Sequence, residues 1–152
     1  MPKSKRKSKQ SPSTAEIADR VHSAAIHLLR RVRREDSNSG EGPARLSVLS
    51  ILVFGGPNTL GDLAAAEQVK PPTMTRIVAG LERTGLARRV VDASDSRKIR
   101  IYATAKGIRI LQEARKRRID ALARGFSKLS QLDLVAIDRA AQILNDLLKR
   151  WN

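Results

Sequence analysis

Residues 59–107 read TLGDLAAAEQVKPPTMTRIVAGLERTGLARRVVDASDSRKIRIYATAKG, and the fold can be predicted from the helix and strand signals in these residues. The spacing of Thr59 and Asp62 is typical of a capping box, in which two side chains cap backbone amides at the start of a helix, so we predict a short helix over 59–67. A second helix is predicted over 71–84, because proline fits the first turn of a helix and Gly85 fits a left-handed end. Two short helices joined by so tight a turn indicate a helix-turn-helix.

A β-hairpin is predicted directly after these helices. Its two runs are LARRVVD (86–92) and RKIRIYAT (97–104), with a polar turn over 93–96. In the second run the apolar residues Ile99, Ile101 and Ala103 alternate with Lys98, Arg100 and Tyr102, and a period of two indicates a strand. We expect the apolar side of the hairpin to pack on the helices and the basic side to face outward.

The flanking segments extend this pattern to the rest of the chain. Before it we predict a helix over 13–34 that opens with the capping pair Ser13 and Glu16, a polar loop over 35–42, and a helix that begins at Pro43 and ends at Gly55-Gly56-Pro57. After it we predict a long helix capped by Thr104 and a last helix capped by Ser130. The predicted fold is therefore mainly α with a small β-hairpin, in the order α-α-α-α-β-β-α-α. The last helix is apolar over so wide an arc that we expect a second protomer to cover it.

Composition narrows the function. The chain has 152 residues, a formal net charge of +15, no Cys and only four aromatic residues. Without Cys there is no disulfide, no Cys-ligated zinc and no thiol switch, and so few aromatic side chains argue against stacking of single-stranded bases. No apolar run approaches the ~20 residues of a membrane-spanning helix. The basic start is not followed by the apolar stretch that a signal peptide requires. We expect a cytoplasmic protein that binds nucleic acid and not a membrane.

The positive charge is concentrated in two blocks. Residues 1–10 carry +5, and residues 70–109 hold ten basic and three acidic residues, for +7. The first block has no apolar periodicity and is predicted to be a disordered basic arm, either a solubilising tail or an arm that contacts phosphates. The second block coincides with the predicted helix-turn-helix and hairpin.

The 71–84 helix is predicted to have one face for packing and one for a partner. At 100° per residue, Met74, Ile77, Val78 and Leu81 cluster on one side, whereas Pro72, Arg76, Ala79 and Arg83 lie opposite, flanked by Thr73, Thr75 and Gly80. Such a helix is slim enough for a major groove about 12 Å wide, where Arg76 could bind a guanine edge and Thr73 or Thr75 a phosphate or thymine methyl. The alternative is an ordinary amphipathic surface helix.

No catalytic, metal or cofactor site is expected. The sequence has no phosphate-cradling Gly loop, no HExxH stretch and no paired nucleophile and base. His22 and His27 are the only histidines, and a spacing of five is poor for a shared metal. We therefore predict no enzyme activity.

The stretch over 59–107 resembles the winged helix-turn-helix of MarR-type bacterial transcription regulators. Three local matches carry the resemblance: Thr59-x-x-Asp62-Leu63-Ala64; Thr75-Arg76 followed by Leu81 and Gly85-Leu86; and Asp92-x-x-Asp95-x-Arg97 ending in Thr104-x-x-Gly107. The sequence departs from the family pattern at Glu67 and Gln68, where an apolar residue and Gly are usual, and at Pro72. A left-handed conformation at Gln68 would cost ~1 kcal/mol relative to Gly.

The resemblance implies a domain organisation and a function. It divides the chain into the basic arm (1–12), a first dimerisation helix and loop (13–42), a winged helix-turn-helix DNA-binding lobe (43–107) and C-terminal dimerisation helices (108–152). It implies a homodimeric, sequence-specific regulator of bacterial transcription, a repressor that a small aromatic or lipophilic effector releases from double-stranded DNA. The alternative is a nucleoid-associated architectural protein with the same fold and little base discrimination.

The resemblance and the side-chain chemistry together assign the DNA contacts. The 71–84 helix is placed in the major groove and the wing over 88–102 at the minor groove, where Arg97 either enters the groove or pairs with Asp95. Lys98, Arg100, Arg88 and Arg89 are expected to neutralise phosphates. The candidate DNA-binding residues are Lys70, Pro72, Thr73, Thr75, Arg76, Arg83, Arg88, Arg97, Lys98 and Arg100.

Overall fold

The computed structural model describes residues 11–92, 95 and 97–151. The elements in chain order are α1 (Thr14–Arg33), a 3-10 helix η1 (Arg34–Ser39), α2 (Pro43–Phe54), α3 (Leu60–Ala66), α4 (Pro71–Arg83), β1 (Ala87–Val91), β2 (Ile99–Ala103), α5 (Ala105–Phe126) and α6 (Gln131–Arg150). Most of the basic arm predicted over 1–12, and Ala93, Ser94 and Ser96 of the predicted hairpin turn, lie outside the described residues.

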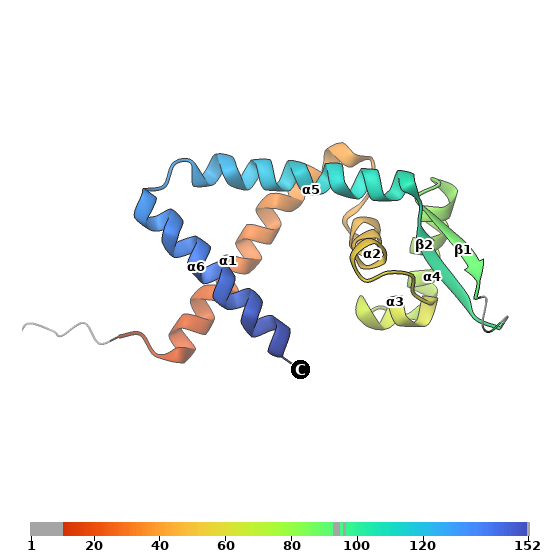
Figure 1. Cartoon of the computed structure of the whole chain (residues 1–152), viewed down its shortest axis with the longest axis horizontal. Helices are drawn as coiled ribbons and strands as arrows, with labels where there is room; N and C mark the ends of the chain where they lie inside the picture. The colour runs from red at the N-terminus through yellow and green to blue at the C-terminus, as the bar shows by residue number, and fades with distance from the viewer. Residues whose placement is uncertain (1–10, 93–94, 96, 152) are drawn as a thin grey trace, which may run out of the picture.

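The chain forms a small lobe at one end and a set of long helices at the other (Figure 1). The lobe contains α2, α3, α4 and the antiparallel pair β1 and β2, and α5 leads from the end of β2 to the far end of the molecule. There α1 and α6 lie near each other, since side chains from both line one apolar hollow with the end of α5. The predicted mainly helical fold with a β-hairpin is confirmed.

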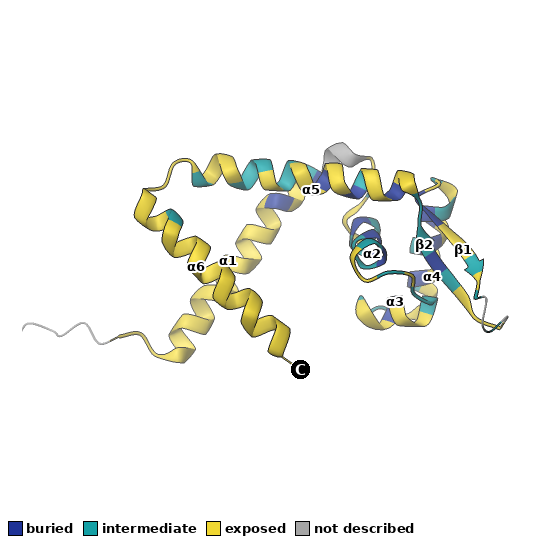
Figure 2. Cartoon of the chain, viewed as in Figure 1, coloured by how far each residue is buried: buried dark blue, intermediate teal, exposed yellow. Residues whose placement is uncertain are grey.

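The hydrophobic core lies in the lobe. It joins apolar side chains from all three short helices, both strands and the first half of α5: Val48, Leu49, Leu52, Leu63, Ala64, Met74, Val78, Leu81, Leu86, Ala87, Ile101 and Leu111. Figure 2 shows the contrast between this buried cluster and the exposed surfaces of α1 and α6. The lobe therefore has a complete hydrophobic core within one chain, whereas most apolar side chains of α1 and α6 are not packed against other parts of the chain.

The predicted helix starts are confirmed by their hydrogen bonds. Ser13 with Glu16 and Thr59 with Asp62 form complete capping boxes at α1 and α3. The hydroxyls of Thr104 and Ser130 accept from backbone amides at the starts of α5 and α6. The end of α4 is confirmed too, because Gly85 has a φ of +72°, the left-handed conformation that favours glycine.

A close approach joins the start of α5 to the start of β1. The Thr104 amide donates to the Leu86 carbonyl at 3.0 Å, and the Thr104 hydroxyl donates to the Gly85 carbonyl at 2.7 Å. A β-carbon on Gly107 would collide with the Leu86 carbonyl oxygen. Gly107 therefore allows α5 to begin directly against the turn that follows α4, which fixes α5 relative to the lobe.

Two sequence expectations need correction. The polar loop expected over 35–42 is in large part the 3-10 helix η1, in which Asp36 is buried and bonded to Arg118 of α5. Ile99 was expected to pack on the helices but is exposed, as is its cross-strand partner Val91. These two residues lie at the turn end of the hairpin, whereas Ile101, two residues further along β2, is fully buried in the core.

Among the described residues, no helix combines the length and the apolar character that crossing a lipid bilayer requires.

Candidate nucleic-acid interface

The α4 helix presents a basic, acid-poor face to solvent. Met74, Val78 and Leu81 are fully buried, while Pro72, Thr75, Arg76, Ala79 and Arg83 are exposed. The Thr75 hydroxyl donates to the Pro71 carbonyl at 3.0 Å, one turn earlier in the same helix. Within the described part of the chain, no acidic side chain forms an ion pair with Arg76 or Arg83. The predicted outward orientation of the arginine-bearing face is therefore found.

The first turn of α4 offers no spare backbone donor. Pro71 and Pro72 have no N–H, and the next two amides, of Thr73 and Met74, both donate to the Lys70 carbonyl, at 2.9 and 3.2 Å. A helix start commonly binds phosphate through such amides. Here the side chains around α4, including the exposed Lys70 and the half-buried Thr73, must supply any phosphate contacts.

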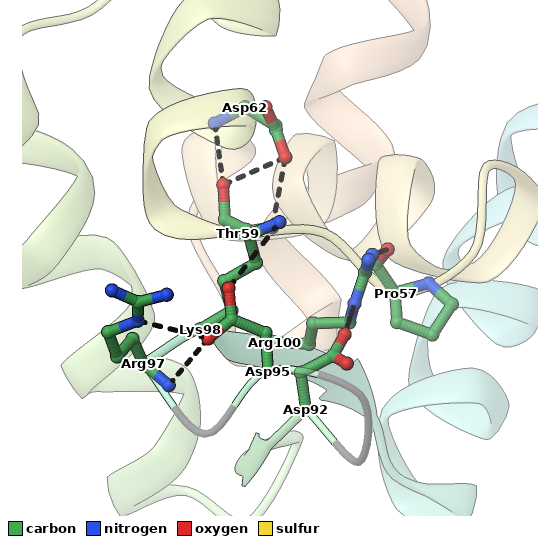
Figure 3. A network of polar contacts seen from close by, with 8 residues as sticks. All are labelled: Pro57, Thr59, Asp62, Asp92, Asp95, Arg97, Lys98 and Arg100. Carbon is green, nitrogen blue, oxygen red and sulfur yellow. Dashed lines mark hydrogen bonds and ion pairs between the residues drawn. The ribbon is translucent and has the colours of Figure 1, made fainter.

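The hairpin presents cations on its outward side and at its turn. Arg88 is exposed and lies over the ring of Tyr102, its cross-strand partner, with the guanidinium carbon 5.1 Å from the ring centroid. The Arg97 side chain is 92% exposed and its backbone amide donates to the Asp95 carboxylate at 3.1 Å (Figure 3). The Nε of Arg97 reaches the same carboxylate at 3.4 Å, and Lys98 lies 3.8 Å from it. Arg97 thus has a loose surface ion pair that a polyanion can replace.

Arg100 has a different environment from the other wing cations. Its Nε donates to Asp92, and its Nη1 lies 3.5 Å from the Pro57 carbonyl oxygen in the loop between α2 and α3 (Figure 3). The hydrogen bond to the Asp92 carboxylate raises the pKa of the Arg100 guanidinium above its ordinary value. Next to it, Ile101 and Asn58 exchange two backbone hydrogen bonds, of 2.8 and 3.3 Å. Together these contacts fasten β2 to the loop that leads into α3.

Arg89 is exposed but lies on the same side of the hairpin as its cross-strand partner, the buried Ile101. Its Nε donates to the Glu82 carboxylate of α4 at 3.1 Å. Glu82 is the one acidic residue of α4, and this pair neutralises it. Arg89 was expected to neutralise a phosphate, but in the structure it joins β1 to the end of α4.

The departures from the usual pattern before α4 have local explanations. Gln68 adopts the left-handed conformation, with a φ of +53°, as anticipated for a tight turn. Glu67, just before it, accepts a hydrogen bond of 2.7 Å from the hydroxyl of Ser47 in α2. The carboxylate at position 67 therefore ties the end of α3 to α2.

Arg45 is a basic residue at this surface that no sequence pattern pointed to. Its guanidinium covers Gly80 of α4, where an added β-carbon would lie 2.5 Å from Nη2, and its Nη1 donates to Glu41 at 2.8 Å. Gly80 was expected to flank the outward face of α4 but is buried under Arg45. This contact depends on how α2 packs against α4, so no local sequence motif predicts it.

Comparison with known proteins supports the same fold. The MarR family model matches residues 43–99. An HTH-type transcriptional regulator of Mycobacterium tuberculosis is 30% identical over 132 residues, covering 87% of this chain and 92% of its own. The structure of a MarR family protein from Bacillus stearothermophilus superposes with a TM-score of 0.76 at 28% identity, over 89% of this chain and 94% of that one. A mutant of MepR from Staphylococcus aureus, described as bound to an oligodeoxyribonucleotide, has a TM-score of 0.65 at 22% identity, over 90% and 99% of the two chains.

Proposed function

This chain belongs to the MarR family of HTH-type transcriptional regulators, and from that premise we propose that it is a homodimeric, sequence-specific repressor that binds double-stranded DNA. Members of this family are regulators and not enzymes, in line with the prediction that the chain has no catalytic role. One observation carries the proposal: on the exposed face of α4, Arg76 and Arg83 form no ion pair with an acid of the described residues, and Glu82, the one acidic residue of α4, is paired with Arg89.

We propose that α4 enters the major groove and that the wing follows the adjacent backbone and minor groove. A mutant of MepR that shares this fold is described as bound to an oligodeoxyribonucleotide, which supports DNA as the partner. Arg76 is placed to read a guanine edge, and the almost fully exposed Arg97 to enter a narrow minor groove. The remaining contacts are assigned to Lys70, Pro72, Thr73, Thr75, Arg83, Arg88 and Lys98, and Arg100 acts by holding the wing in place.

A second copy of the chain is proposed to cover α1, α6 and the end of α5. The structure buries no residue of α6, although Ile143, Leu147 and Leu148 are apolar and each is about half exposed or more. Apolar side chains of α1, among them Ile17 and Leu28, are exposed in the same way. A dimer would place two α4 helices about 34–36 Å apart, one turn of DNA. A pair bridging two grooves would obstruct access to the DNA, which makes repression the expected effect.

An effector is proposed to bind where the long helices meet the lobe. A hollow of about 160 Å³ lies there, lined by Leu29, Arg33, Pro43, Leu46, Ser47, Ser50 and Arg118. Its apolar and basic lining suits a small aromatic or lipophilic acid. A ligand at this junction would change the angle between the lobe and the dimer helices, and with it the spacing of the two α4 helices.

Selection of bound fragments from random duplex DNA at physiological salt tests the function. A repressor of this kind should enrich a near-palindromic site and favour it over random DNA by ~10³-fold or more. The charge of +15 favours the second candidate, a nucleoid-associated architectural protein, and that protein would enrich no common sequence. In either case the protein acts on DNA in the bacterial cytoplasm. Sedimentation at low micromolar concentration should show a dimer, and a stable monomer would contradict the assignment of α1 and α6.

A further inference from the structure

A basic hollow lies beside α4, between its first half and the start of α2. It has a volume of about 580 Å³ and is lined by Gly42, Pro43, Ala44, Arg45, Thr73, Arg76 and Ile77. Two of these residues carry guanidinium groups and none is acidic. The hollow opens on the same side of α4 as Arg76, one of the residues assigned to DNA.

The Arg45 guanidinium is held in place at this hollow. Glu41 accepts from its Nη1 at 2.8 Å, and the Glu41 side chain is only 9% exposed, whereas that of Arg45 is 30% exposed. The carboxylate therefore lies behind the guanidinium rather than in front of it. Gly80 allows the group to lie flat against α4, because any β-carbon there would occupy its place.

A guanidinium has five N–H donors, so the hydrogen bond to Glu41 leaves others for a ligand. Its planar fork suits the oxygens of a phosphate. The backbone at the start of α4 supplies no donor, because Pro71 and Pro72 have no N–H and the amides of Thr73 and Met74 are bonded to Lys70. The α4 side of the hollow can therefore hold a phosphate only through side chains, and Thr73 lies in the same lining as Arg45.

We propose that this hollow binds one phosphate of the DNA backbone next to the major groove occupied by α4, with Arg45 as its main ligand and the Thr73 hydroxyl as a second donor. The inference rests on the proposed function, because it needs α4 in the groove. Arg45 adds affinity without reading sequence, and because the same guanidinium covers Gly80, the phosphate contact also fixes the position of α4.

Fluorescence anisotropy with a labelled random-sequence duplex of about 30 base pairs tests the proposal over a range of salt concentrations. For Arg45→Gln we expect weaker binding and a salt dependence reduced by about 1 in log K per log salt for each copy of the chain bound. Arg109→Gln is the matched control. It removes the same charge from an exposed position of α5, on the side opposite the buried Gly107 and Leu111.

A second variant separates loss of the contact from loss of the fold. Gly80→Ala retains the charge of Arg45 but pushes its guanidinium aside, and we expect weaker binding of the same duplex with an unchanged or higher thermal midpoint. Equal salt dependence for Arg45→Gln and Arg109→Gln, or unchanged binding by Gly80→Ala, would overturn the phosphate site. As long as the wild-type chain binds the duplex, neither result contradicts the proposed function. If the wild-type chain binds no duplex at all, the proposed function itself fails.

Discussion

Asp36 and Arg118, separated by 82 positions in the sequence, form two parallel hydrogen bonds of 2.7 Å each. The Asp36 side chain is only 2% exposed, while that of Arg118 is 31% exposed. The pair joins η1, which connects α1 to α2, to the middle of α5. It therefore fixes the junction between the long helices and the lobe.

Removing the cation from this pair should destabilise the protein strongly. Arg118→Ala leaves the buried Asp36 carboxylate without its bidentate partner, and we expect the free energy of unfolding to fall by about 3 kcal/mol. Urea denaturation at fixed protein concentration measures the loss. Arg115→Ala, at an exposed position of the same helix, should change stability by no more than about 0.5 kcal/mol. Equal effects of the two variants would show that the ion pair contributes little.

Substitutions of Gly107, which is closely packed, and of Gly61, which is not, should have opposite effects on stability. Gly107→Ala should lower the free energy of unfolding by about 1–3 kcal/mol, because the new methyl group meets the Leu86 carbonyl and the side chain of Leu49. Gly61→Ala should raise it by about 0.5–1 kcal/mol, because alanine favours a helix and only ordinary contact awaits it there. Thermal or chemical denaturation checks both. Stabilisation by Gly107→Ala would contradict the described junction.

The left-handed conformation of Gln68 predicts a stabilising substitution. Gln68→Gly should raise the free energy of unfolding by about 1 kcal/mol, because glycine adopts a φ of +53° without the steric cost that a β-carbon brings. Gln68→Ala retains the β-carbon and serves as the control, with stability close to that of the wild type. A destabilising effect of Gln68→Gly, measured by denaturant midpoint, would show that the Gln68 side chain makes a compensating contact.

The capping box of α3 predicts a component of acid sensitivity. Hydrogen bonds from Thr59 hold the pKa of the Asp62 carboxyl below its ordinary value of 3.8. The native state thus favours the ionised form, and the resulting stability is present above the ordinary pKa and is lost as pH falls through the lowered one. Asp62→Asn should therefore lose less stability than the wild type between pH 5 and about pH 2. Thermal midpoints across this range test the difference, and identical pH profiles would exclude it.

Local rules predicted much of the fold and the outward face of the interface. Capping pairs such as Thr59 with Asp62 act over three residues, and helical periodicity placed Met74 inside and Arg76 outside, so the sequence alone locates them. The alternation of Ile101 with its basic neighbours likewise predicted the strands of the wing. The exposed Ile99 shows that this pattern does not reveal how much of a strand the helices cover.

The contacts that escaped prediction join residues far apart in the chain. Asp36 with Arg118, Arg45 over Gly80, and Arg100 with the Pro57 carbonyl depend on how helices and strands are placed in space. A sequence shows these residues only as members of polar or basic stretches. Arg89 and Arg100 were both expected to contact phosphates, because the sequence does not show that each side chain already has an acidic partner within the protein.

The proposed function requires the exposed face of α4 to read bases in duplex DNA. The affinity of Arg76→Ala for a selected site and for random duplex tests this requirement. We predict a loss of about 1–3 kcal/mol, roughly 5- to 150-fold, on the selected site, a smaller loss on random duplex, and relaxed preference at one base position. Loss by the same factor on both duplexes would contradict the claim, because Arg76 would then contact only the backbone.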